Sequence, residues 1–511
     1  MCGIIGLISQ FDKDVINKVL EGLLSLQHRG QDSSGISNGK LCIKDNGYAI
    51  NIFNNKILEN LKSNIAIGHV RYSTTKVKDD KQIQPFVIEV DYKITLVHNG
   101  NIINIDYMKQ YLSKKFGINS DSNSDSEILT QIIYAKLYFE FNSIINKDTI
   151  FQIVNFLQDN LIGSFSVIII IEDLVLVCFR DRYGIRPLLY GIDKEKNSHL
   201  FSSESGVYET VNFEYIRDIL PGETMYISNT TGDVYTNINP KSYLIPCIFE
   251  YLYFARQDSY INEISVYQSR LLIGELLGKT ILEKMNENLE IDCIVPVPDT
   301  SRIFALGVHN VLKKPYHEAL VKNRYIDRTF ILENENEINK NIKRKLNTID
   351  YLIKDNCVMV VDDSIVRGNT SKYVVSLLKK AGAKKVYIAT DDKSLSYLCL
   401  GFTKNVMLTS SEHRNGTERV FEVAKNLNFV DDDIVINVQC DMPDVSPINI
   451  DFLASMVYET RSLCTLYTGL SKEQLTDENT VKLILNNKSQ IIMVEMEFGF
   501  GWGLVLRSAA S

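Results

Sequence analysis

Cysteine stands at position 2, directly after Met1, at the head of the run MCGIIG. If Met1 is removed, Cys2 carries a thiol and a free α-amino group on the same residue. An amine can take the proton of a neighbouring thiol, directly or through a water, so the two groups form a nucleophile with its own base. A cysteine at the second position is weak evidence by itself. The side chains that would serve such a nucleophile occur further along the chain.

Asn99 and Gly100 are candidates to stabilise the oxyanion of a tetrahedral intermediate. They lie in the run HNGN, after the strand-like run ITLV. The side-chain amide of Asn99 and the backbone N–H of Gly100 could both donate hydrogen bonds to an oxyanion. The alternative is an ordinary hairpin turn, which the dipeptide Asn-Gly favours in isolation.

Two charged residues could bind the two ends of an amino acid. Arg71 lies in GHVRYST at the end of a strand-like run, and its guanidinium could hold a carboxylate through two hydrogen bonds. Asp125, in the run SDSE, could bind an ammonium group. The alternatives are a surface salt bridge for Arg71 and a helix N-cap at Ser124 or Asp125, with Glu127 in the first turn.

A second group of residues indicates a phosphate site. In VMVVDDSIVRGNTS at 358–371, a strand leads to two adjacent acids and a loop that opens a helix. Backbone N–H groups and hydroxyls at a helix N-terminus bind phosphate, and the acids can hold ribose hydroxyls or Mg²⁺. The alternative is an ordinary N-capped turn. PVPDTS at 296–301 is a second strand-end loop, from which Thr300 could contact a metal ion. The residues of the first loop that could take part are Asp362, Asp363, Ser364, Gly368, Thr370 and Ser371.

The secondary structure that we expect around these residues differs between the first and the second half of the chain. Up to about residue 235, short β-branched runs and turns surround two helical stretches, at 15–26 and 127–139. This pattern is typical of two packed sheets with helices outside. From 247 to 390, strands and helices alternate, which predicts a parallel sheet. The charged stretch 332–345 inside that region predicts a loop, with a solvent-exposed helix as the alternative.

The sequence pattern changes near residue 386. The strand KKVYIAT leads into a further α/β pattern that runs to about residue 490. The last residues, 491–511, are glycine-rich and apolar without periodicity, and we leave them unassigned.

Composition excludes several classes of protein. A chain of 511 residues with 45% hydrophobic and 23% charged residues is expected to form several globular domains. The net charge of −8 disfavours nucleic acid as a partner. Nine scattered cysteines favour reduced thiols in the cytoplasm. We expect neither a secretory signal nor a membrane span, because polar residues interrupt each apolar run.

These motifs, in this order, closely resemble the glutamine phosphoribosylpyrophosphate amidotransferase (amidophosphoribosyltransferase) family, which performs the first committed step of purine synthesis. The resemblance runs from Met1 to about Lys385. Further blocks carry it: LQHRGQDSSGI, RDRYGIRPL, SSES, RDILPGE, CIFEYLYFAR, ISVYQSRLLIGELL, IVPVPDTSR, VKNRYIDRTFI, KRKLN and VVDDSIVRG. It implies an N-terminal-nucleophile glutaminase sandwich (αββα) over 2–235 and a type I phosphoribosyltransferase domain over 247–390, in an α/β and α+β multidomain chain.

The resemblance also implies roles for individual residues. Cys2 is then the nucleophile, with Asn99 and Gly100 as the oxyanion hole. Glutamine would be held by Arg71 and Asp125, with Arg29 of QHRG nearby. Metal positions are matched by Thr300, Asp362 and Asp363. The positions that match phosphoribosyl-pyrophosphate binding are Asp362, Asp363, Ser364, Arg367, Gly368, Asn369, Thr370 and Ser371, together with Lys322 and Arg324 of a loop that closes over the substrate.

The resemblance implies Mg²⁺ as the cofactor, a homo-oligomer, and nucleotides as feedback inhibitors. Two small departures are Lys76 in place of glycine and Asn369 in place of threonine. Some members carry an iron–sulfur cluster, for which Cys247 matches one ligand position. The segments that would supply the other three ligands are absent, so we expect no cluster and interpret Cys247 as a buried thiol.

A larger departure begins near Val386, where the family's continuation is missing. YIATDDKS, SSEHRNGTERVFEVA and IVINVQCDMPDVSP instead resemble part of 3-deoxy-manno-octulosonate cytidylyltransferase. The triphosphate-binding loop and the last third of that enzyme are absent, so we expect no cytidylyl transfer and interpret Asp441 as a strand-end acid. Our hypothesis is a hybrid reading frame joined within KKVYIAT. The missing C-terminal elements disfavour the synthase half of the reaction.

Two other functions remain as alternatives. One is a non-catalytic regulator that binds phosphoribosyl pyrophosphate, which the intact Cys2 motifs argue against. The other is a cytidylyltransferase, which the missing triphosphate loop makes a poor candidate.

Overall fold

The structure is a computed structural model of the whole chain. It describes residues 2–72, 82–284, 291–323, 346–362 and 369–389, and five short strands beyond them, with the backbone alone at 283–284, 369–372, 387–389 and in those strands. The chain divides into two compact units, Met1–Ser364 with Tyr373–Ala389, and Ile365–Lys372 with Thr390–Ser511. Each unit is described by itself.

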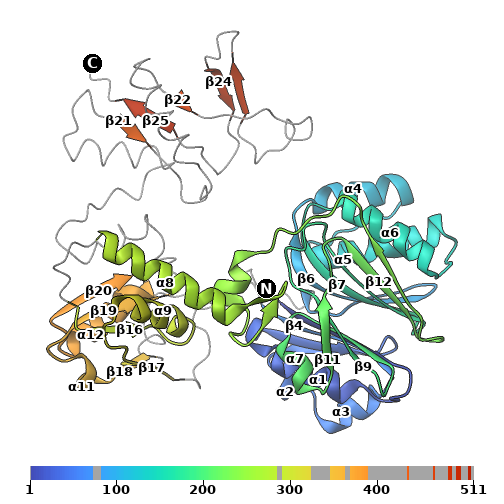
Figure 1. Cartoon of the computed structure of the whole chain (residues 1–511). Helices are drawn as coiled ribbons and strands as arrows, with labels where there is room; N and C mark the ends of the chain where they lie inside the picture. The colour runs from blue at the N-terminus through green and yellow to red at the C-terminus, as the bar shows by residue number, and fades with distance from the viewer. Residues whose placement is uncertain are drawn as a thin grey trace. The chain divides into compact units, whose positions relative to one another are not determined.

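The first part of the chain forms two sheets packed face to face, with helices on both outer faces (Figure 1). One sheet has the strand order β11-β9-β10-β1-β4-β2-β3 and the other β13-β12-β8-β7-β6-β5. This arrangement confirms the predicted sandwich. The strands of the first sheet are β1 (Gly3–Ser9), β2 (Ser33–Ser37), β3 (Cys42–Asn46), β4 (Ile65–Arg71), β9 (Leu189–Asp193), β10 (Ser198–Ser202) and β11 (Glu214–Asp218). Those of the second are β5 (Phe86–Glu89), β6 (Lys93–Ile102), β7 (Gly163–Ile171), β8 (Val175–Arg180), β12 (Glu223–Ser228) and β13 (Val234–Ile238).

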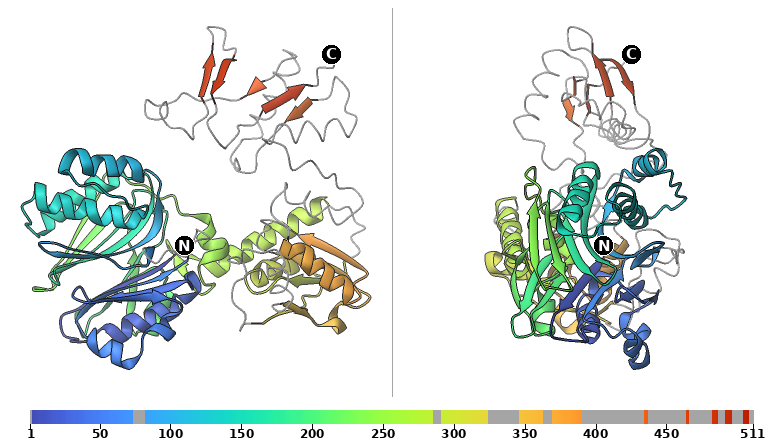
Figure 2. Two further views of the ribbon diagram at one scale, coloured as in Figure 1. Left: turned by 180° about the vertical axis from the view of Figure 1, so that it is seen from behind. Right: turned by 90° about the vertical axis from the view of Figure 1, so that its right-hand side faces the viewer.

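Helices cover the outer face of each sheet, as two views of the molecule show (Figures 1 and 2). Amphipathic α1 covers the first sheet with its buried leucine and valine side chains, and α5 covers the second. The helices beside the first sheet are α1 (Ile16–Ser25), α2 (Ala49–Ile52), α3 (Asn55–Asn60) and α7 (Gly206–Thr210). Those beside the second are α4 (Ile105–Phe116), α5 (Asp125–Ala135), which a π-helical turn (Lys136–Glu140) extends, and α6 (Lys147–Asn160).

Strand alternation determines which residues face the space between the two sheets. In β1, Ile4 and Ile8 pack in the core between the sheets, whereas Ile5 and Leu7 pack towards α1. In β6, Val97 belongs to the core between the sheets. Side chains two residues apart in a strand share a face. Residue 99 therefore belongs to the inner face of β6, and residue 2, which directly precedes β1, is in register with the inner face of that strand.

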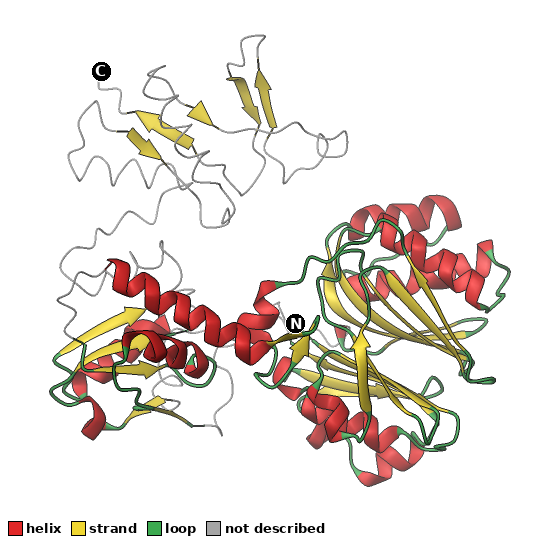
Figure 3. Ribbon diagram, viewed as in Figure 1, coloured by secondary structure: helices red, strands yellow, loops and turns green. Residues whose placement is uncertain are grey.

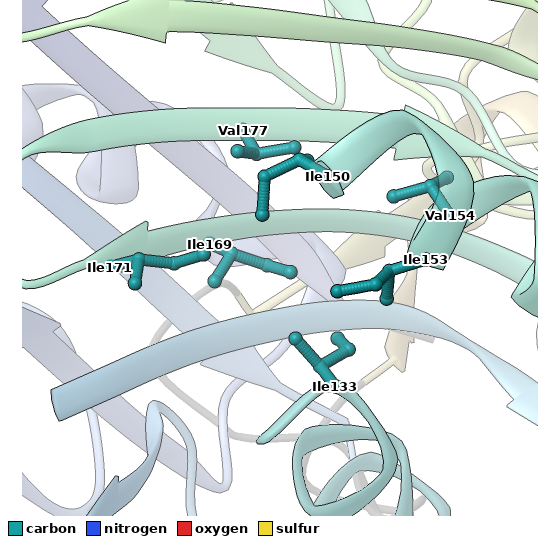
Figure 4. Close-up of a pocket in the computed structure, with 7 residues that line it drawn as sticks. All are labelled: Ile133, Ile150, Ile153, Val154, Ile169, Ile171 and Val177. Atoms are coloured by element: carbon teal, nitrogen blue, oxygen red, sulfur yellow. The ribbon is translucent and has the colours of Figure 1, made fainter. Parts of the chain in front are cut away.

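A small gap lies in the core between α5, α6 and the second sheet (Figure 4). All the side chains that line it are aliphatic: Ile133, Ile150, Ile153, Val154, Ile169, Ile171 and Val177. A binding site needs a few polar groups to orient its ligand. We therefore interpret this gap as a packing void.

A connecting segment follows β13. It contains a π-helical turn, η4 (Glu250–Phe254), a short hairpin of β14 (Tyr260–Ile261) and β15 (Ile264–Ser265), and the long helix α8 (Val266–Lys284). The side chain of Arg270 in α8 is 4% exposed and bonds to the carbonyl oxygens of Tyr251 (2.8 Å) and Ala255 (2.8 Å). These bonds fasten η4 to the beginning of α8.

The next part is a parallel sheet of β16 (Cys293–Pro296), β19 (Cys357–Val361) and β20 (Lys385–Ala389), in the order β16-β19-β20. Helices α8 and α9 (Arg302–Leu312) pack on one face, and α12 (Asn369–Lys380) packs on the other. The parallel pairing was predicted from the alternation of strands and helices. KKVYIAT, where the sequence changes character, contributes β20 to this sheet.

A second hairpin and a short helix lie beside this sheet: β17 (Leu320–Lys322), β18 (Leu346–Thr348) and α11 (Asp350–Ile353). The predicted loop at 332–345 lies outside the described residues.

Beyond residue 389, the second unit is described at five short strands: β21 (Ile434–Ile436), β22 (Cys464–Thr465), β23 (Lys482–Leu485), β24 (Ile491–Glu495) and β25 (Leu504–Arg507) (Figure 3). They pair antiparallel as β21-β25-β22 and β23-β24. Two of them, β24 and β25, fall in the tail that the sequence left unassigned. Across the described ranges, no helix has the length and hydropathy needed to cross a bilayer.

We predict that Gly307→Ala destabilises the parallel-sheet domain. Inside a helix this change normally adds about 1 kcal/mol of stability. Here the new methyl group would lie 2.3 Å from the carbonyl oxygen of Leu271 in α8, and overpacking of this kind costs roughly 1–3 kcal/mol. We expect a lower melting temperature for Gly307→Ala than for the wild type. The control is Gly206→Ala, whose added Cβ would have no neighbour nearer than 3.8 Å. A melting temperature of Gly307→Ala at or above wild type would contradict the prediction.

Candidate active site

The backbone of Cys2 is held from both sides. Its nitrogen donates to Oδ1 of Asn99 over 3.2 Å, and its carbonyl oxygen accepts from Nε of Arg29 over 3.2 Å. The next residue, Gly3, pairs with Val70 across β1 and β4, which brings the strand end at Arg71 alongside Cys2. Cys2 as a whole is half-buried.

The Asn99 side chain is fully buried, and its Nδ2 has no hydrogen-bond partner among the described residues. Asn99 and Gly100 lie inside β6, opposite Ser166 and Phe165 of β7. The hairpin-turn alternative is therefore wrong, because the pairing of β6 with β7 outweighs the local turn preference of Asn-Gly. A buried amide donor without a partner is costly, and it suits a site where a transient oxyanion binds.

Glycine is required at position 100 by close packing. A Cβ there would lie 2.0 Å from the carbonyl oxygen of Ser164 and 2.5 Å from Nε2 of His98. Any side chain would push β6 away from β7 and displace Asn99, so this glycine preserves the position of the amide.

Ser124 is the N-cap of α5, as one alternative predicted, and accepts from the backbone of Glu127. Asp125 is the first residue of the helix. Its Oδ2 accepts from the backbone N–H of Ile102 at the end of β6 (3.1 Å), and its Oδ1 accepts from the N–H of Ser126 (2.7 Å). The side chain of Asp125 keeps 21% exposure. It is thus anchored beside β6 while its side chain remains partly exposed.

Arg71 ends β4 and bonds to the side-chain oxygen of Gln82. It is half-buried, and Gly30 packs against its backbone, where a Cβ would lie 2.4 Å from the carbonyl carbon of Arg71. This partner is a neutral amide rather than a carboxylate. This contact is therefore not the surface salt bridge that was the alternative for Arg71.

The prediction that Arg29 binds glutamine is wrong for this structure. Its side chain has 0% exposure, and its guanidinium bonds to Glu204 (2.5 Å) and Glu250 (2.6 Å) as well as to the Cys2 carbonyl. A ligand cannot reach a guanidinium that is enclosed in this way. The sequence gave no local sign of these bonds, since the two glutamates lie 175 and 221 residues away.

The electrostatics of this cluster confirm that its charges are paired. Burial alone would raise the pKa of Glu204, but Arg29 and His28 outweigh it and lower that pKa to about 2. Burial would lower the pKa of Arg29, but Glu250 and Glu204 raise it well above its usual range. Both groups therefore stay ionised at neutral pH.

Part of the predicted phosphate site lies among the described residues. Asp362 follows β19 and accepts from Oγ of Ser301, over 3.3 Å, in the loop after β16. Nζ of Lys322 at the end of β17 bonds to Asp299 of the same loop (2.9 Å). The ends of β16 and β19 thus meet, as expected for the carboxyl edge of a parallel sheet, and the end of β17, from the neighbouring antiparallel hairpin, reaches the same loop. Ser301 and Asp299 lie in the predicted loop beside Thr300, but the sequence did not single them out.

The other predicted phosphate ligands cannot be placed. Asp363, Ser364, Arg367, Gly368 and Arg324 lie outside the described residues, and only the backbone of Asn369, Thr370 and Ser371 is described, at the start of α12.

The donors that are described fit Mg²⁺. Asp362, Thr300 and Asp299 offer oxygen atoms at one edge of the sheet, and Mg²⁺ is usually held by one or two carboxylates plus substrate phosphates. Within the described ranges, no three His, Cys, Asp or Glu side chains gather closely enough to hold a metal by themselves. The arrangement suits an ion that the substrate helps to bind.

Cys247 is half-buried rather than buried, which corrects the sequence interpretation. It lies on the connecting segment, where its Sγ accepts from Nη1 of Arg186 over 3.5 Å. Its backbone N–H bonds to the carbonyl oxygen of Ile185, so the segment contacts the sandwich at this point.

Comparison with known proteins identifies the family. A glutamine amidotransferase domain model matches residues 69–208, a phosphoribosyl transferase domain model matches 267–391, and a cytidylyltransferase model matches 371–501. The amidophosphoribosyltransferase of Pasteurella multocida is 38% identical over 93% of this chain and 96% of that protein. The chain belongs to the amidophosphoribosyltransferase family. The Escherichia coli amidophosphoribosyltransferase is 38% identical over 76% of the chain and 78% of that protein.

A solved structure supports the same assignment. The glutamine phosphoribosylpyrophosphate amidotransferase of Bacillus subtilis, complexed with ADP and GMP, matches with a TM-score of 0.64 and 30% identity over 76% of this chain and 81% of that one. The family resemblance and the fold class are thereby confirmed. The resemblance of the C-terminal region to a cytidylyltransferase is confirmed too. The Pasteurella alignment extends into that same region, so the two similarities overlap there.

We predict that His69 makes this chain less stable as the pH falls. Burial, assisted by the Arg71 cation, lowers the pKa of His69 from 6.5 to about 3. Between these values only the unfolded chain takes up the proton, so the free energy of unfolding falls by roughly 2 kcal/mol from pH 6.5 to pH 5. We expect the melting temperature of wild type to fall more steeply over this range than that of His69→Gln.

His317→Gln is the control for this comparison, because His317 is half-buried in the parallel-sheet domain. The melting temperature of His317→Gln should fall between pH 6.5 and pH 5 as steeply as that of wild type. Equal slopes for wild type and His69→Gln would contradict the assignment of the slope to His69.

Proposed function

We propose that this chain is a glutamine-dependent amidophosphoribosyltransferase. It would convert glutamine, 5-phosphoribosyl pyrophosphate and water into 5-phosphoribosylamine, glutamate and pyrophosphate. The observation that carries the proposal is the buried amide of Asn99, whose oxygen holds the Cys2 nitrogen while its own NH₂ has no partner among the described residues. Family membership supports both halves of the reaction.

In the first half, the α-amine of Cys2, freed by removal of Met1, takes the thiol proton. The sulfur attacks the glutamine amide carbon, and Nδ2 of Asn99 with the N–H of Gly100 stabilises the oxyanion. The intermediate collapses to a thioester as the amide nitrogen leaves with the proton as ammonia. Water then cleaves the thioester, giving glutamate and restoring the thiol.

Arg71 and Asp125 would orient the substrate for this attack. The Asp125 carboxylate is fixed by two backbone N–H groups, and its partly exposed side chain would contact the ammonium group. Arg71 would bind the carboxylate, exchanging its neutral partner Gln82 for a charged one. Holding both ends of the amino acid places the amide carbon at the sulfur.

In the second half, ammonia attacks C1 of the phosphoribosyl group and pyrophosphate departs. Asp362 and Thr300 would lie at the ribose and pyrophosphate, and Lys322 would contact a phosphate, with the loop 363–371 and Arg324 as further ligands. Mg²⁺ bound there would neutralise charge on the departing pyrophosphate. Because ammonia is protonated in bulk water, closure over both sites would protect it.

Two further properties belong to the proposal. The Bacillus relative was solved with ADP and GMP, which supports nucleotide inhibitors here. The family resemblance is the basis for proposing a homo-oligomer. The described cysteines are all free thiols, which supports a cytoplasmic location. The unpartnered donor at Asn99 favours a catalyst over a non-catalytic regulator.

We predict that Asn99→Ala lowers kcat for glutamine hydrolysis by about 10²–10³-fold, because loss of one oxyanion donor has an effect of this size in other enzymes. Release of glutamate with and without phosphoribosyl pyrophosphate is the measurement, and Cys2→Ala should abolish it. Asn38→Ala is the control, since Asn38 is an equally buried asparagine whose bonds go to Leu61, Lys40 and Leu41. Full turnover by Cys2→Ala, or by Asn99→Ala, would refute the mechanism.

A further inference from the structure

The carbonyl of Cys2 is attached to a buried charge cluster. The Arg29 guanidinium donates through Nε to the Cys2 carbonyl, through Nη1 to Oε1 of Glu204 (2.5 Å) and through Nη2 to Oε2 of Glu250 (2.6 Å). The two carboxylate side chains are each 1% exposed, and that of Arg29 is 0% exposed. A guanidinium is planar and its N–H directions are fixed. The two glutamates therefore set the direction in which Nε points.

One of these glutamates comes from outside the sandwich. Glu204 follows β10, whereas Glu250 opens η4 on the connecting segment, beyond β13 (Val234–Ile238), the last strand of the sandwich. The other Glu250 oxygen, Oε1, accepts from Arg186 over 3.4 Å. A residue that the glutaminase sandwich does not contain thus contacts the group that holds the nucleophile.

The connecting segment is fixed at both of its ends. Oε2 of Glu204 accepts from the backbone N–H of Arg256 (3.1 Å) and from Oγ of Ser259 (2.9 Å), and the N–H of Tyr260 bonds to Oγ of Ser205 (2.8 Å). At the other end, Arg270 of α8 holds the carbonyls of η4. The position of Glu250 therefore depends on α8 as well as on the sandwich.

We propose that Glu250 and Glu204 are positioning residues for Cys2, acting through Arg29. Residues 250–259 of the connecting segment then complete the glutaminase site. This inference rests on the proposed function. A processed N-terminal residue has no preceding chain to fix it, so its carbonyl and its nitrogen are the groups by which it can be held. Asn99 holds the nitrogen and Arg29 holds the carbonyl.

Glu250→Gln in the full-length chain tests the proposal. Glutamine has nearly the same shape but no charge, so the guanidinium loses one of the two anions that direct it. We expect kcat for glutamine hydrolysis to fall about 10- to 100-fold, the loss that a misplaced reacting group produces. We expect KM for glutamine to change less than about threefold, because Arg71 and Asp125 bind the substrate ends.

Glu223→Gln is the matched control. Glu223 is 1% exposed and binds Arg217 through both carboxylate oxygens (2.7 Å each), within the same sandwich. Loss of its charge should lower the melting temperature by an amount similar to Glu250→Gln while leaving kcat at the wild-type value. Glu250→Asp should recover part of the lost kcat. Wild-type kcat in Glu250→Gln, or an equal loss of kcat in the control, would overturn the proposal.

A second measurement keeps the two proposals separate. Hydrogen exchange of the peptide 2–8, read by mass spectrometry, should be at least about tenfold faster in Glu250→Gln than in wild type, since an unanchored strand end opens more readily. If wild type releases no glutamate, the proposed function fails, and this exchange still decides the positioning role. If Glu250→Gln does not fold, Arg29→Lys replaces it, because lysine keeps the charge but cannot reach three acceptors in one plane. Exchange equal to wild type would overturn the inference.

Discussion

The Asn99 side chain accepts a hydrogen bond from the Cys2 nitrogen and leaves its own NH₂ without a partner in the described part of the chain. Cys2 and Asn99 lie two residues from Ile4 and Val97, which pack between the two sheets. Since side chains two residues apart share a face, both residues are directed to that space. The pairing of β6 with β7 fixes the amide, and Gly100 permits that pairing where a Cβ would clash. Burial makes the unpaired donor costly in the resting protein, and that cost is recovered only when an oxyanion accepts its hydrogen bond.

The same nucleophile is held on its other side by a charge cluster that draws on distant parts of the chain. Arg29 follows α1, Glu204 follows β10, and Glu250 belongs to the connecting segment. A buried arginine whose planar guanidinium bonds to two carboxylates is held in one orientation, because its N–H directions are fixed. The glutaminase sandwich and the segment that leads to α8 therefore form one structural unit around Cys2.

The sequence allowed some of this to be predicted, and the limits have physical causes. Alternating β-branched runs and helical spacing predicted the sandwich and the parallel sheet, because burial on one face imposes those periods. Asn-Gly carries a strong local turn signal, so only non-local pairing shows that Asn99 lies in a strand. Arg29 was expected to contact glutamine, since no local pattern reveals glutamates that lie far away in sequence. Cys247 was expected to be buried, but an isolated thiol has no periodicity from which its exposure could be read. Ser301 and Asp362 come together because two parallel strands end at the same edge.

The most direct test is a crystal structure of the processed chain after Cys2 has reacted with an electrophilic analogue of glutamine. The account predicts that the oxygen of the adduct accepts a hydrogen bond of about 3 Å from Nδ2 of Asn99, while the freed α-amine remains bound to Oδ1 of the same side chain. An adduct oxygen directed into solvent, with the Asn99 NH₂ still unpaired, would contradict it.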